Sequence, residues 1–235
     1  MPTGKVPPTA KSQKSISFCL TNCQLTPSPQ NGSLAVPNAR TITSPVNHLL
    51  SLPFTLKLAT RDWHPASHIS FAANHPSQPQ PFTSTTTIVH PSDPSRSYTT
   101  TLWPVHCVAD SPGAQLVPEF DTSRIDGIID KGRDPRVEMY SAFYDPFRVE
   151  DSGLERTLRD AGVTHVYVVG LAADYCVKAT AEHAVDEGFK TYIVEEGTKP
   201  VMPDTWPECR DQIIAKGVRM VSIDGDEVKR VEQLS

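Results

Sequence analysis

The chain has 235 residues, of which 27 are acidic and 22 basic, giving a net charge of -5. The length suits one α/β domain with a single core, and the charge offers no basic surface for nucleic acid or an anionic membrane. We therefore expect a small-molecule partner. Five cysteines without a CxxC pair argue against a disulfide framework. No stretch resembles a membrane span or a signal peptide, so we expect an intracellular protein, cytoplasmic by default, with nucleus and peroxisome left open.

The first half of the chain has few regular patterns. Residues 1–15 contain little that could be buried and are expected to be a disordered tail. A short strand is expected at 16–21 and, after a loop rich in turn formers, a helix over 43–52. A strand follows at 56–59, and the Pro, Ser and Thr cluster of 76–101 is typical of an excursion on the surface.

Strands alternate with helices in the second half. The expected elements are strand 124–129, helix 153–161, strand 166–169, helix 174–187, strand 191–195, helix 205–216 and strand 218–223. This alternation predicts an α/β three-layer sandwich, with a mainly parallel sheet of about six strands covered on both faces. We expect one domain over residues 16–225, followed by a C-terminal tail at 226–235.

A candidate nucleophile lies at the end of the strand expected at 166–169. This strand is continuously apolar, as in a sheet buried on both faces, and Gly170 ends it. With Asp174 as the N-cap of the next helix, Cys176 falls in the first helical turn, at the edge where open α/β sheets bind ligands. Unpaired amides and the helix dipole there favour the thiolate. A small buried cysteine explains this stretch alone equally well.

A candidate metal site follows the strand expected at 56–59. Asp62 and His64 are one residue apart, His68 is four residues further, and His106 in the segment LWPVHCV is a third candidate imidazole. Carboxylate and imidazole together suit a divalent metal such as zinc. His-rich loops are often only solvated, so spacing alone leaves both interpretations open. Trp103 in the same segment either stacks on a flat ligand or anchors the core.

Four motifs in register carry a family resemblance. DWHPASHISFA, LWPVHCV, Asp130-Lys131-Gly132 and GLAADYCVKAT resemble the nicotinamidases (pyrazinamidases) of the isochorismatase-like cysteine hydrolase family, and the similarity covers residues 16–225. The resemblance implies the family fold and the hydrolysis of nicotinamide to nicotinate and ammonia in NAD salvage. It also implies a bound metal, usually zinc but in some members iron or manganese. Family members assemble variously, so a homo-oligomer is left open.

The resemblance implies a role for each matching residue. Cys176 matches the nucleophile that forms a thioester, and Lys131 matches the lysine of a Cys, Lys and Asp triad. Leu171 and Ala172 fall at a cis peptide, so the amides of Ala172 and Cys176 would form the oxyanion hole. An acidic partner should take the thiol proton and later deliver it to the departing ammonia.

The same comparison implies how metal and substrate are held. Asp62, His64 and His106 match metal ligands, while His68 matches a residue that ligates in some members and only neighbours the metal in others. The metal holds the pyridine nitrogen of nicotinamide, and Trp103 matches an aromatic residue that packs on the ring.

The chain departs from the family at its start. The family motif DxQxDF is missing, and the nearest register places Asn22 over the catalytic Asp and Pro27 over an aromatic residue of the pocket. An Asn carboxamide cannot take up a proton, and losing a general base costs about 10² to 10⁴ in rate. Either the protein is an impaired member or its first residues are a mistaken gene model. We favour the second, because the chain also contains no acidic residue before Asp62.

Two other functions compete with nicotinamide hydrolysis. The first is a catalytically impaired relic that binds metal and ligand and acts by binding or by partnering active subunits. The second is hydrolysis of another substrate of the superfamily, such as isochorismate or an N-carbamoyl amine. The DWH and WPVH segments argue against the second, because those relatives generally lack that set of ligands.

Overall fold

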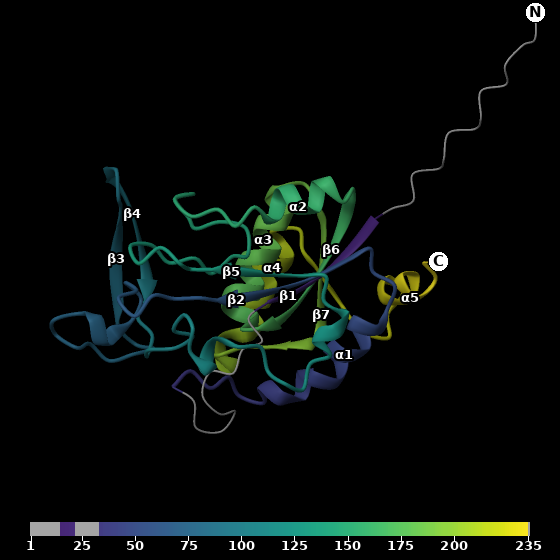
Figure 1. Ribbon diagram of the computed structural model, residues 1–235, viewed down its shortest axis with the longest axis horizontal. Coiled ribbons are helices and arrows are strands. Elements are labelled where there is room, and N and C mark those ends of the chain that lie inside the picture. Colours follow the sequence, from purple (N-terminus) through teal and green to yellow (C-terminus); the bar gives the residue numbers. More distant parts are fainter. Residues whose placement is uncertain (1–14, 22–32, 235) are drawn as a thin grey trace, which may run out of the picture.

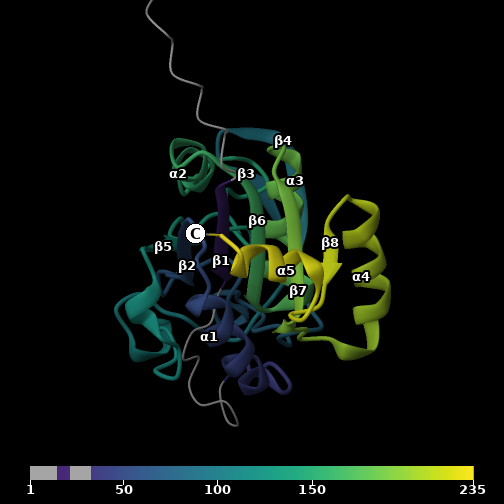
Figure 2. The same ribbon diagram turned by 90° about the vertical axis from the view of Figure 1, so that its right-hand side faces the viewer.

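The computed structural model describes the backbone of residues 15–21 and, in full, residues 33–234. Its main sheet has six strands in the order β5-β2-β1-β6-β7-β8, and every neighbouring pair is parallel (Figures 1 and 2). These strands are β1 (Ser15–Thr21), β2 (Leu56–Asp62), β5 (Gly127–Lys131), β6 (Val163–Leu171), β7 (Lys190–Lys199) and β8 (Arg219–Val221). The prediction of an α/β fold with a parallel sheet of about six strands is confirmed.

Helices cover both faces of this sheet. They are α1 (Thr43–Ser51), α2 (Leu154–Asp160), α3 (Lys178–Asp186), α4 (Trp206–Ala215) and α5 (Asp226–Glu232). Successive residues of β6 point to opposite faces, so Tyr167 and Val169 pack with α1 and α5, whereas Val166 and Val168 pack with α2, α3 and α4. In Figure 1, α1 lies below the sheet and α2 and α3 lie above it.

The strand register places several chemically useful residues at one edge. Because all six strands are parallel, the carboxyl ends of β1, β2, β5 and β6 meet there. Asp62 and Lys131 are paired across β2 and β5, and Thr21 pairs with Thr60 on one side and Gly170 on the other. Asn22 follows Thr21 in the chain but lies outside the described residues, as does the tail expected at the start.

Most of the C-terminal segment expected to be a tail is helical. Residues Asp226–Glu232 form α5, in which Val228 and Val231 are fully buried, and the Tyr167 hydroxyl donates to the carbonyl of Glu227 at 2.8 Å. Two valines three residues apart give this short helix one apolar face, and that face packs on the sheet. The domain therefore extends to Glu232. None of the described helices is long and apolar enough to cross a membrane.

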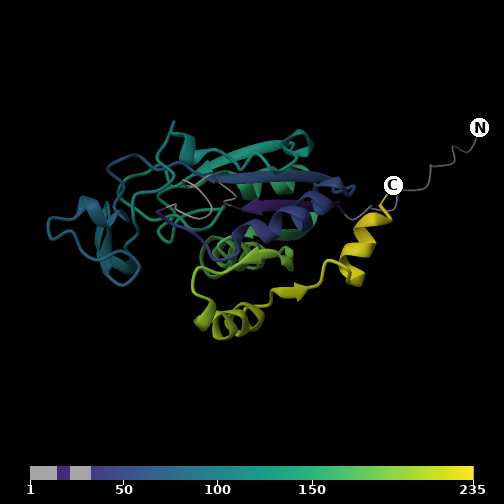
Figure 3. The same cartoon turned by 90° about the horizontal axis from the view of Figure 1, so that it is seen from below.

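The excursion expected at 76–101 contains regular structure. Strands β3 (Thr85–His90) and β4 (Asp93–Thr101) form an antiparallel hairpin that lies at the opposite end of the molecule from α5 (Figures 1 and 3). Its Ile88 is fully buried and packs with Val137 and Phe147. The β-branched threonines of this segment favour strands, whereas the sequence interpretation gave more weight to its prolines.

Asp174 does not cap a helix. A π-helical turn, Ala173–Val177, connects β6 to α3, and the Asp174 carboxylate instead accepts hydrogen bonds from the backbone amides of Val201 and Met202 at 2.9 and 2.8 Å. This carboxylate therefore ties the turn that contains Cys176 to the segment after β7. The predicted position of Cys176, in the first turn beyond a central strand, is confirmed.

Candidate active site

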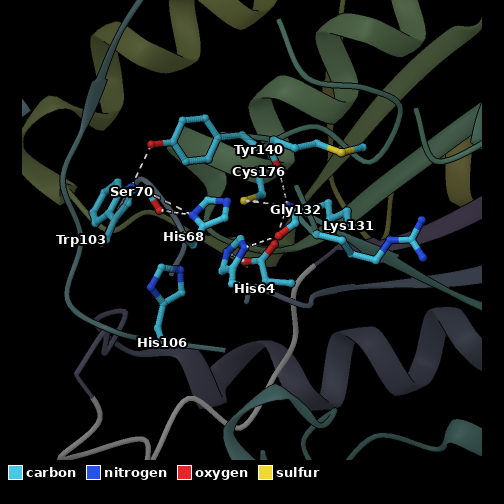
Figure 4. Close-up of polar contacts among 12 residues, drawn as sticks. His64, His68, Ser70, Trp103, His106, Lys131, Gly132, Tyr140 and Cys176 are labelled. Carbon is cyan, nitrogen blue, oxygen red and sulfur yellow. Dashed lines mark hydrogen bonds and ion pairs between the residues drawn. The ribbon is translucent and has the colours of Figure 1, made fainter. Parts of the chain in front are cut away.

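Lys131 is at the centre of the polar contacts at the sheet edge. Its Nζ donates to Asp62 Oδ1 at 2.6 Å and to the carbonyl of Met139 at 2.8 Å, and lies 3.7 Å from Cys176 Sγ (Figure 4). The lysine is fully buried, and Asp62 and Cys176 are also buried. The structure thus brings together two residues predicted to be catalytic with one predicted to bind metal.

Charge pairing outweighs burial for Asp62 and Lys131. Burial would raise the pKa of Asp62, but the positive charge of Lys131 lowers it to about 2. Burial would likewise lower the pKa of Lys131, but Asp62 and Cys176 raise it above its usual value. Both groups are therefore charged at neutral pH, and they form a buried ion pair.

Cys176 differs from the prediction in its protonation. Burial raises the pKa of its thiol to about 12, and Lys131 opposes this shift without overcoming it. The predicted preference for thiolate is thus not supported, because the apolar surroundings disfavour the charged form more than the lysine favours it. The thiol needs a proton acceptor when it attacks.

The backbone beside the thiol matches one expectation. The Leu171–Ala172 peptide is cis, and the Ala172 carbonyl accepts from the amides of Tyr175 and Val177 at 3.1 Å each. Ala172 and Cys176 both line the same cavity. An oxyanion hole made from the amides of these two residues stays a prediction.

Asp62, His64 and His106 form a compact group suited to a metal ion. One potential ligand atom from each lies within 4.8 Å of the others, and all three residues are buried. His64 Nδ1 and His106 Nδ1 lie 2.8 Å from the carbonyls of Gly132 and Pro104. A carbonyl only accepts, so each ring holds its proton on Nδ1 and leaves Nε2 free to ligate.

The chemistry of this group fits a divalent cation. Burial lowers the pKa of both His64 and His106, so both rings are neutral, as ligands must be. Gly132 is required here, because it has φ of +67° and a Cβ at this position would lie 2.5 Å from the His64 ring. Two imidazoles and one carboxylate are typical ligands of a catalytic zinc with open positions.

His68 is close to this group without belonging to it. Its ring centroid lies 4.2 Å from that of His64, and its Nδ1 lies 2.8 Å from Ser70 Oγ (Figure 4). Its Nε2 is buried and has no hydrogen-bond partner among the residues that the structure describes. The sequence left its role open between ligand and neighbour.

One cavity of about 70 Å³ connects the metal group with the thiol. Aromatic side chains of Trp103, Tyr140 and Tyr175 line it together with Cys176. The Trp103 indole donates to the Tyr140 hydroxyl at 2.8 Å and meets the Tyr175 ring edge-on at 4.7 Å. Trp103 is therefore both an anchor in the packing and a wall of the cavity, so the two interpretations of it are compatible.

Sequence reasoning missed Glu138, Tyr140 and Tyr175 as cavity residues. The hairpin holds Glu138 and Tyr140 in place. The Tyr98 hydroxyl of β4 accepts from the amide of Glu138 at 2.9 Å and donates to its carbonyl at 3.2 Å. The Thr100 hydroxyl, also of β4, lies 2.9 Å from the Tyr140 hydroxyl. No motif spacing signals these contacts. Tyr175 could have been found from its place next to the nucleophile.

Comparisons with known proteins agree with this geometry. A model of the isochorismatase domain matches residues 74–223. A nicotinamidase from Saccharomyces cerevisiae is 34% identical over 198 residues, which cover 81% of this chain and 91% of that protein. A crystal structure of the yeast nicotinamidase bound to the inhibitor nicotinaldehyde superposes with a TM-score of 0.82 at 32% identity, covering 88% and 99% of the two chains.

A second solved structure is similar over nearly the same length. A pyrazinamidase from Pyrococcus horikoshii in complex with zinc has a TM-score of 0.68 at 30% identity, covering 88% of this chain and 99% of that one. The matched domain spans β5 to β8, together with the hairpin and the segments that carry His106, Lys131 and Cys176. The chain therefore belongs to the isochorismatase family.

Proposed function

We propose that this protein hydrolyses nicotinamide to nicotinate and ammonia, with Cys176 as nucleophile and a divalent metal, zinc in the first instance, at Asp62, His64 and His106. One observation carries the proposal: buried Lys131 contacts both the Cys176 sulfur and the Asp62 carboxylate, so the thiol and the metal group share one cavity. The similarity of this chain to nicotinamidases over most of its length supports nicotinamide as the substrate.

A primary amide is a poor electrophile with a poor leaving group. Cys176 attacks the amide carbon, and the positive charge of Lys131 stabilises the sulfur as the thiol loses its proton. The amides of Ala172 and Cys176 are proposed to stabilise the tetrahedral oxyanion. The proton that the thiol loses ends on the departing nitrogen, which leaves as ammonia, and water then hydrolyses the thioester to nicotinate and the free thiol.

The other wall of the cavity orients the substrate. When bound, the metal supplies a Lewis-acidic position for the pyridine nitrogen. Trp103, Tyr140 and Tyr175 offer flat apolar faces and edges against which a six-membered aromatic ring can pack.

A panel of four amides tests this proposal. The zinc-loaded full chain is expected to release ammonia from nicotinamide and pyrazinamide, and much less from benzamide, which lacks the ring nitrogen. N-carbamoylsarcosine is the fourth substrate and represents other branches of the superfamily. Equal rates on benzamide and nicotinamide would contradict the role given to the metal group, and preference for the carbamoyl substrate would contradict the proposed substrate class.

The missing triad acid is tested separately. Asn22 lies outside the described residues, so its place opposite Cys176 rests on sequence register alone. If it occupies the position of the acid, Asn22→Asp supplies the missing proton acceptor and raises kcat by about 10² to 10⁴. Asn38→Asp, a change of the same kind in the turn before α1, is the control and should leave kcat unchanged. No increase in the Asn22 variant would remove that residue from the account of catalysis.

A further inference from the structure

One wall of the cavity comes from a segment without regular secondary structure. Val201 lines the cavity and lies in residues 200–202, between the end of β7 at Lys199 and the short turn that begins at Pro203. Up to its last residue β7 is held by the sheet, because Lys199 pairs with Leu171 of β6. Beyond that residue the backbone groups of this wall need other partners.

Asp174 supplies the partners. Pro200 and Pro203 have no amide hydrogen, so Val201 and Met202 are the only two backbone donors among these four residues. Both donate to the Asp174 carboxylate, one to each oxygen, at 2.9 and 2.8 Å. We call these two hydrogen bonds the clasp. A single side chain therefore satisfies every backbone donor of this piece of the wall.

The turn that contains the nucleophile has its own support. The Ala172 carbonyl accepts hydrogen bonds from the amides of Tyr175 and Val177 at 3.1 Å each. Val177 is fully buried and packs in the core between the sheet and α3. Cys176 lies between these two anchored residues. Loss of the clasp should therefore loosen the wall around Val201 and leave the thiol in place.

A carboxylate two residues from the nucleophile could instead be the acid that the triad lacks. The geometry argues against that role, because each Asp174 oxygen already accepts from a backbone amide. Asp174 lines a separate depression on the surface, together with Thr205 and Glu208, whereas Val201 and Tyr175 line the cavity around the thiol. The carboxylate thus faces the outer side of the wall.

We propose that Asp174 is a positioning residue for the substrate ring: through the clasp it holds Val201 in the cavity wall and so sets the width of the cavity beside Cys176. It acts on which molecules fit and not on the chemistry at the sulfur. An apolar wall discriminates by size, typically by about 10-fold or more for a change of one methylene group. The inference rests on the proposed function only for the identity of the ring.

Thiol alkylation measures this width without metal or substrate. Iodoacetamide and the larger N-phenylmaleimide both alkylate cysteine, and peptide mass spectrometry reports Cys176 separately from Cys107 and Cys209. In the full chain, Asp174→Ala should raise the rate with N-phenylmaleimide by about 10-fold and leave the rate with iodoacetamide nearly unchanged. An equal rise with both reagents would show that the clasp holds the thiol itself. That result, or unchanged rates with both, overturns the proposal.

Further variants separate the clasp from a general loss of structure. Asp174→Asn keeps one acceptor oxygen, so its rate with N-phenylmaleimide should lie between those of the wild type and Asp174→Ala. Val201→Ala opens the same wall directly, and the double variant with Asp174→Ala should gain no more than the larger single effect. Asp204→Asn, an exposed carboxylate on the same stretch of chain, is the matched control. Gains that multiply in the double variant contradict the connection between Asp174 and Val201.

Steady-state kinetics of the zinc-loaded full chain gives the last readout. Asp174→Ala should raise KM for nicotinamide with little change in kcat, and should reduce the preference for nicotinamide over the larger quinoline-3-carboxamide by about 10-fold. A fall in kcat at constant KM would assign Asp174 to the chemistry and overturn the proposal. If the wild type releases no ammonia from nicotinamide, the proposed function fails, and the ratio of the two alkylation rates still decides the role of Asp174.

Discussion

The site is built by two regions that differ in how they hold their residues. At the carboxyl edge of the sheet, Asp62 and Lys131 end adjacent strands and are placed by parallel register. On the opposite side, Glu138 and Tyr140 lie in an irregular segment that the β3–β4 hairpin holds through side-chain hydrogen bonds. The reactive groups therefore depend on the core of the fold, whereas one wall of the substrate cavity depends on the hairpin, which lies outside that core.

The largest effect is expected at the sheet edge. Lys131→Met leaves the Asp62 carboxylate buried without its cation, and breaking such a pair costs about 3 to 5 kcal/mol of unfolding free energy. Urea unfolding of the metal-free protein should show this loss, and zinc should restore part of it by neutralising the carboxylate.

Lys216→Met is the control, because its ion pair with Asp186 is exposed to solvent and should contribute little to stability. If Lys131→Met lowered the unfolding free energy as little as the control does, the buried ion pair at the sheet edge would not be a main support of the site, which contradicts the comparison of the two regions.

A smaller effect is expected at the hairpin. Tyr98→Phe removes the hydroxyl that bonds to both backbone groups of Glu138, which should cost about 1 to 3 kcal/mol of stability. It should also raise KM for nicotinamide more than it lowers kcat, because Cys176 and Lys131 are carried by the carboxyl ends of sheet strands. Of these two, Lys131 contacts the hairpin-held segment only through the Met139 carbonyl. Tyr144→Phe, which loses a bond to Glu187, is the matched control with unchanged KM. A fall in kcat at constant KM would show that the hairpin supports the chemistry and not the cavity wall.

Sequence predicted the sheet edge well for a physical reason. Residues at the ends of parallel strands converge, so motifs next to apolar runs placed Asp62, Lys131 and Cys176 near one another before any coordinates. For Asp62, His64 and His106, spacing alone left the metal site open, and the family resemblance selected this set, which the structure brings together. The protonation of Cys176 could not be predicted, because it depends on burial by side chains distant in sequence.

The hairpin side was predicted poorly. Its contacts join residues about 40 positions apart, such as Tyr98 with Glu138, and each depends on a single hydroxyl that leaves no periodic pattern. The C-terminal helix α5 was missed because its apolar face consists of only two valines. The prolines of the segment 76–101 led to the prediction of a surface excursion, although its threonines favour the strands β3 and β4 that the structure has there.

The central claim is that Cys176 attacks a nicotinamide amide inside this cavity, and ammonia release measures it most directly. The zinc-loaded full chain should release ammonia from nicotinamide, and Cys176→Ala should lower the rate at least about 10⁴-fold while zinc affinity is kept. Cys209→Ala, a partly exposed cysteine outside the cavity, should keep the wild-type rate. Ammonia release at the same rate from the wild type and from Cys176→Ala would contradict the account.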